Sequence, residues 1–128
     1  MKQAMAKRNQ KYLNLFQIRL PLPGQVSFLH RVSGALLFLV IPFILVLLGR
    51  SLDSPGGFAA VFDVFLRPGV RIAALILLWA YLHHLFAGIR FLLLDLHVGA
   101  TLTAARLSAG IVLWAAIVST AVIGALLW

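Results

Sequence analysis

The sequence contains no cysteine and no glutamate, and its acidic side chains are Asp53, Asp63 and Asp95. Without cysteine, the chain forms no disulfide, iron–sulfur cluster or thiolate metal site. Only 11% of its 128 residues are charged, whereas 62% are hydrophobic. A soluble domain is about half apolar and a quarter charged. This composition therefore excludes a soluble domain and predicts a protein that lies in a bilayer.

Positive charge dominates, with a formal net charge of +8 at pH 7. Nucleic-acid binding would require these charges on a solvated face. Here they stand at the ends of apolar runs, so they indicate membrane topology and attraction to anionic lipid instead. The basic N-terminus is not followed by the apolar run and cleavage site of a signal peptide. Residues 1–24 are therefore predicted to be a retained cytoplasmic segment.

Three apolar stretches, at about 26–49, 70–94 and 104–128, are each long enough to cross a hydrocarbon core of about 30 Å. The loop between the first two contains the turn signals SLDSPGG and RPG around FAAVFDVFL, which suggests a short interfacial helix. The third stretch has small residues at four-residue spacing, which allow close helix approach. The sequence therefore predicts an all-α membrane protein: one transmembrane anchor domain, residues 1–128, with three spans.

The distribution of lysine and arginine predicts the orientation of these spans. Eight such residues stand before the first span or flank the turn between the second and third, and three stand on the other side. The N-terminus is therefore predicted to be cytoplasmic. The eight are Lys2, Lys7, Arg8, Lys11, Arg19, Arg31, Arg90 and Arg106, and the three are Arg50, Arg67 and Arg71.

Ionisable residues within a span are costly and suggest a functional site. His84 stands about 15 Å of helix before Leu94, near mid-membrane, and Gly88 follows one turn later on the same face. An imidazole beside a glycine gap suits a haem ligand, although a histidine that bonds a neighbouring helix explains the same residues. Spacing does not choose between His83 and His84. Because His30 and His97 are predicted to lie at other depths, a second ligand would come from another chain.

Two further groups lie near the cytoplasmic ends of the first two spans. Ser27 and Arg31 are neighbours one turn apart, with His30 beside them, and such groups bind a quinone carbonyl or haem propionates. An arginine that extends to water is the simpler interpretation of spacing alone. For Arg90 and Asp95, spacing alone likewise favours interfacial anchors.

Two blocks carry a resemblance over essentially the whole chain. The first, S-x-x-H-R-x-[ST]-G, is SFLHRVSG at 27–34, and the second, H-x-x-x-G-I-R-x-x-x-x-D, is HLFAGIRFLLLD at 84–95. With NLFQIRLPLPGQV before the first block, they resemble the cytochrome b556 subunits of bacterial succinate dehydrogenase. That family anchors respiratory complex II, a succinate:ubiquinone oxidoreductase of the tricarboxylic acid cycle and electron transport, in the inner membrane.

The resemblance implies that His84 is the axial ligand of a haem b shared with a second hydrophobic anchor subunit, which supplies the other ligand. It implies an iron–sulfur subunit and a flavoprotein subunit on the cytoplasmic face, ubiquinone as substrate, and a chain with no complete active site of its own. Site roles follow for six more residues: quinone binding by Ser27 and Arg31, propionate contacts by His30 and Arg31, and support by Gly88, Arg90 and Asp95.

One departure concerns Phe91, which stands where relatives often carry histidine after the GIR triplet. Any polar role of that histidine is absent here or supplied elsewhere. Two alternatives stay open at this point: the anchor of a quinol:fumarate reductase, and a haem-free structural or transport subunit. A transporter would place an acidic group or a broken helix near mid-membrane, whereas Asp95 stands at a helix end.

Overall fold

The computed structural model describes residues 20–127 and contains four helices and no strand within that range. These are α1 (Leu22–Asp53), α2 (Pro55–Leu66), α3 (Pro68–Asp95) and α4 (Leu102–Leu127). Three of them, α1, α3 and α4, are long and apolar enough to cross a membrane. The prediction of an all-α protein with three candidate spans is confirmed.

Prolines determine where the first three helices separate. Ser54 and Arg67 each precede a proline and adopt extended backbone angles, with ψ of 160° and 130°. The ring of a following proline disfavours the helical conformation at exactly such positions, so each helix ends there and the next begins on the proline. Ser54 also caps α2, because its hydroxyl oxygen accepts a hydrogen bond from the Gly57 backbone N–H at 3.0 Å.

The turn between α3 and α4 uses a different device. His97 and Gly99 have positive φ angles of 61° and 72°, which reverse the chain after Asp95. The Thr101 hydroxyl then accepts a hydrogen bond from the Ala104 N–H at 3.3 Å and caps the start of α4.

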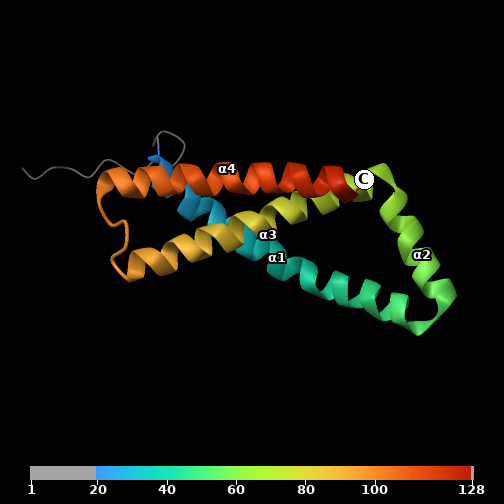
Figure 1. Cartoon of the computed structure of the whole chain (residues 1–128). Helices are drawn as coiled ribbons and strands as arrows, with labels where there is room; N and C mark the ends of the chain where they lie inside the picture. Colours follow the sequence, from blue (N-terminus) through green and yellow to red (C-terminus); the bar gives the residue numbers. More distant parts are fainter. Residues whose placement is uncertain (1–19, 128) are drawn as a thin grey trace, which may run out of the picture.

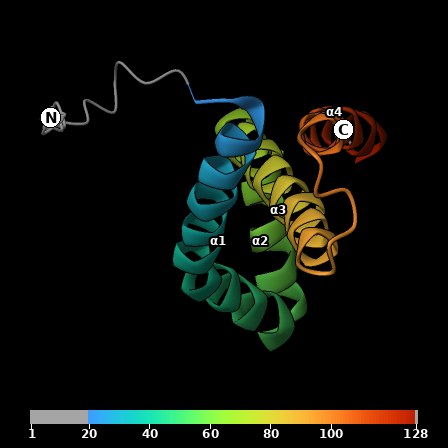
Figure 2. The ribbon, with the colours of Figure 1, turned by 90° about the vertical axis from the view of Figure 1, so that its left-hand side faces the viewer.

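The three long helices lie side by side, with α3 between α1 and α4 (Figure 2). The start of α1, the end of α3 and the start of α4 share one end of the bundle, and α2 joins α1 to α3 at the opposite end (Figure 1). Neighbouring spans therefore run antiparallel. Residues late in α3 consequently face residues early in α1.

Small side chains form most of the contacts between these helices. Ala80, Ala87, Ala109 and Ala116 are fully buried, whereas large residues such as Leu39 point outward. In lipid, large apolar side chains gain nothing by turning inward, and helices associate where small residues let their backbones approach. The predicted small-residue face of the third span thus lies against α3.

The helices of the structure begin before all three predicted ranges, at Leu22 for α1, Pro68 for α3 and Leu102 for α4. A helix also forms in the loop where a short one was suggested, at α2. Most of the predicted cytoplasmic segment 1–24 lies outside the described residues. The cytoplasmic location of the N-terminus stays a prediction.

We expect Gly124→Leu to destabilise the α3–α4 pair by about 1–3 kcal/mol, the usual cost of overpacking. A Cβ atom at Gly124 would already lie 2.6 Å from Leu75 Cδ2. The measurement is the thermal unfolding midpoint in detergent. Gly49→Leu is the control, because a Cβ atom there meets nothing within 4 Å; equal midpoints for both variants would contradict this packing.

Candidate functional site

The imidazole of His84, on α3, is held against α1 by hydrogen bonds. Its Nδ1 lies 3.1 Å from the backbone oxygen of His30 and 3.3 Å from the hydroxyl of Ser33. The Ser33 hydroxyl donates to the same His30 oxygen at 3.0 Å. Because a carbonyl oxygen only accepts, this geometry assigns the ring proton to Nδ1 and leaves the lone pair on Nε2.

A glycine of α1 makes the room that this ring needs. A Cβ atom at Gly34 would lie 2.8 Å from His84 Cε1 and 3.3 Å from Nδ1, closer than real side chains come. At Gly88, by contrast, a Cβ atom would be 3.7 Å from His30 Nε2, an ordinary contact. Within this chain, the glycine that fits the His84 ring is therefore Gly34 and not Gly88.

His30 and His84 also contact each other through their rings. The rings stack with centroids 4.1 Å apart and planes inclined by 7°. The prediction that His30 lies at a different depth is wrong, because the antiparallel packing of α1 on α3 brings the two to one level. Stacked face to face, the two rings would not both hold the iron of one haem.

The second histidine of the pair, His83, has a different environment. Its side chain is fully buried and stacks on Trp79, with ring centroids 5.2 Å apart. Neither of its ring nitrogens has a hydrogen-bond partner within residues 20–127. His84, in contrast, is only partly buried, so its ring is the one of the two that can meet a group outside this chain.

The other predicted site residues are only partly brought together. On α1, Ser27 lies about one turn before His30 and is partly buried, and Arg31 directly follows His30 and is exposed. Asp95 is exposed at the last position of α3. Phe91 touches His30 edge-on, with ring centroids 5.1 Å apart. An aromatic ring thus occupies the place beside His30 that a histidine would take.

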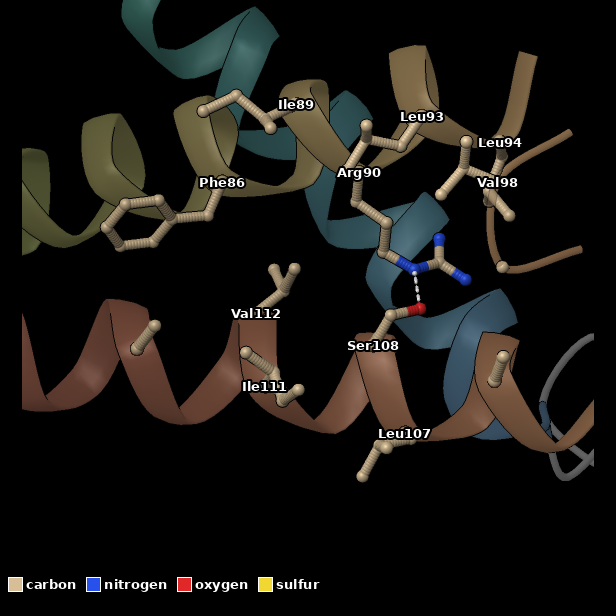
Figure 3. A pocket seen from close by; sticks show the side chains of 13 residues that line it. Phe86, Ile89, Arg90, Leu93, Leu94, Val98, Leu107, Ser108, Ile111 and Val112 are labelled. Atoms are coloured by element: carbon tan, nitrogen blue, oxygen red, sulfur yellow. Dashed lines mark hydrogen bonds between the residues drawn. The ribbon is translucent and has the colours of Figure 1, made fainter. Parts of the chain in front are cut away.

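Arg90 extends toward α4, with its guanidinium carbon 5.5 Å from the centroid of the Phe91 ring. Its Nε donates to the Ser108 hydroxyl at 3.0 Å (Figure 3). Its Nη2 donates to the backbone oxygen of Ala105 at 3.1 Å. The side chain is only 6% exposed. The interpretation of Arg90 as an interfacial anchor stays a prediction, while its observed hydrogen bonds go to α4.

Sequence reasoning gave no role to Ser33 and Gly34, although both stand in the first recognised block. Their position one turn after His30 was a usable signal, since residues four apart share a helix face. Ser108 and Ala105 carried no such signal, because a backbone oxygen and a lone serine reveal nothing until α4 is placed beside α3.

These features define a helical membrane protein with a hydrogen-bonded histidine site between its first two spans. The chain belongs to the succinate dehydrogenase/fumarate reductase transmembrane subunit family, whose model matches residues 5–123. It is 34% identical over 117 residues to the succinate dehydrogenase cytochrome b556 subunit of Coxiella burnetii (strain RSA 493 / Nine Mile phase I), covering 91% of this chain and 94% of that relative. The chain is thus a membrane subunit of such a multi-subunit complex.

Proposed function

We propose that this chain is the membrane anchor and haem b-binding subunit of a succinate:ubiquinone oxidoreductase in a bacterial inner membrane. Its family membership and its likeness to a cytochrome b556 subunit support the class of complex. The orientation of His84 carries the proposal of haem. Metal-ligating histidines usually donate the N–H of their other nitrogen to an oxygen, which fixes the tautomer, and His84 Nδ1 makes that bond to His30.

The residues present fit a haem ligand on three counts. The His84 Nε2 lone pair lies in the ring plane, whereas the His30 ring stacks on the face of the imidazole. The ring is partly exposed, as a group shared between two chains requires. The absence of a side chain at Gly34 also leaves room for the His84 ring against α1. His84 would thus hold the iron of a haem that, when bound, takes up and releases single electrons.

The second ligand is proposed to come from another hydrophobic anchor subunit. His97 lies past the end of α3, and the His30 ring stacks on the face of the His84 ring, so neither would hold a haem iron together with His84. The iron–sulfur and flavoprotein subunits are proposed to dock at the end of the bundle where α1 begins. That end carries Arg31, Arg90 and Arg106, three of the basic residues that are predicted to be cytoplasmic.

The quinone site is proposed to use Ser27 and Arg31. They stand on the second and third turns of α1, and the exposed Arg31 would donate hydrogen bonds to a quinone carbonyl. His30 and Arg31 are proposed to neighbour the haem propionates. Gly88 and Asp95 are kept as supporting residues, whereas the contacts of Arg90 with α4 direct it elsewhere.

We expect His84→Ala to abolish the haem b absorbance of the purified complex, because the iron loses its ligand from this chain. His83→Phe should keep the absorbance, since the buried His83 ring faces the interior of this chain. His97→Ala, beyond α3, is a second control. Full absorbance in the His84→Ala complex would refute the ligand assignment.

Gly34→Ala is expected to alter the haem without removing its ligand. A methyl group there must displace the His84 ring, whose Cε1 would lie 2.8 Å away. The electron paramagnetic resonance g values and the midpoint potential of haem b should both shift. Gly49→Ala is the matched control on the same helix, with open space around it. Identical spectra for the two variants would count against the seating of His84 by α1.

Arg31→Ala should lower quinone reduction about tenfold or more, the usual effect of losing a charged hydrogen bond. Succinate oxidation with an artificial acceptor should change little, because that reaction ends before the quinone. Steady-state assays of both reactions measure this difference. Arg67→Ala, at the opposite end of the bundle, should affect neither. A parallel loss of both activities in Arg31→Ala would argue against a quinone role.

A further inference from the structure

The guanidinium group of Arg90 is a buried cation without an acidic partner. Its hydrogen bonds go to two neutral oxygens, those of Ser108 and Ala105. No carboxylate lies within ion-pair distance of it in the part of the chain from 20 to 127, and Asp95 is exposed at the helix end. Neutral oxygens satisfy N–H donors but do not cancel a charge, and an unpaired charge in this setting is costly. The site therefore favours an anion.

A groove between α3 and α4 leads to this cation. It has a volume of about 390 Å³, and Arg90 and Ser108 are polar residues in a lining that is otherwise mainly apolar (Figure 3). The apolar side chains project from both helices and several are half exposed or more. They include Phe86, Ile89 and Leu93 from α3, and Leu107, Ile111 and Val112 from α4.

The groove has the shape and depth of a lipid site. Its lining on α4 runs from Ala104 to Ala115, about 16 Å along the helix axis. Arg90 stands five residues before Asp95, the last residue of α3, which is about 7–8 Å of helix. The cation thus lies nearer the end of the span than its middle, and the apolar walls continue along α4 away from that end.

We propose that this groove binds an anionic phospholipid, with the headgroup phosphate paired to Arg90 and one acyl chain lying between α3 and α4. Charge complementarity carries the choice of ligand, because the groove offers a cation and no acidic side chain. The proposal is independent of haem and quinone, since Arg90 faces α4 and not His84. Basic pockets between spans are a known form of headgroup recognition.

The test is native mass spectrometry of the delipidated complex, titrated with phosphatidylglycerol or with phosphatidylcholine. The wild type should bind one phosphatidylglycerol at least tenfold more tightly than phosphatidylcholine. Arg90→Gln should lose that preference, because a charged hydrogen-bonded contact to phosphate accounts for about tenfold or more. Arg90→Lys, which keeps the charge, should retain part of it. Arg106→Gln is the control for general attraction to basic surfaces, since Arg106 is exposed.

A second variant tests the groove without altering the cation. Ile111→Trp should fill the path of the acyl chain and weaken phosphatidylglycerol binding, whereas Val122→Trp, exposed farther along α4, should not. Intact haem absorbance would verify that each complex is folded. Equal binding of the two lipids by the wild type, or an unchanged preference in Arg90→Gln, would overturn the proposal. Equal losses in Arg106→Gln and Arg90→Gln would also overturn it, as would a groove closed to lipid by a partner chain.

Discussion

The hydrogen bond from His84 to the backbone oxygen of His30 is the interaction on which the candidate site depends. It joins α1 to α3 at the level of the paired rings and fixes which ring nitrogen of His84 carries the proton. The His84 ring can make this hydrogen bond because Gly34 has no side chain, whose Cβ atom would lie 2.8 Å from His84 Cε1. One turn of α1, from His30 to Gly34, therefore both packs against α3 and orients the proposed ligand His84.

The need of polar side chains for hydrogen-bond partners within the protein explains the contacts that α3 makes with both of its neighbours, α1 and α4. In a bilayer, polar side chains must find partners within the protein, and small residues bring backbones near enough to provide them. Toward α1, a backbone oxygen receives His84; toward α4, another receives Arg90. The two residues stand six positions apart, so they project from different faces of the helix. One face serves the proposed haem site and the other the proposed lipid groove.

His83 shows how the tertiary structure separates neighbours in sequence. His83 and His84 have identical chemistry, and their spacing to nearby glycines does not decide between them. Rotation by about 100° per residue turns one ring into the interior and leaves the other at a partly exposed position. Because the His83 side chain is buried within this chain, we propose His84 and not His83 as the ligand shared with another chain. This choice requires knowledge of how the helices pack.

The sequence by itself determined the number and type of spans, because length and hydropathy are local properties that lipid selects directly. It also determined the two blocks that carry the family resemblance, and with them His30 and His84. Only the tertiary structure decided that those two rings stack, that Gly34 is the glycine beside His84, and that Arg90 bonds α4. Those facts depend on how closely the helices approach and how they are rotated against one another. Small residues permit close approach, but their pattern along the chain does not specify the rotation.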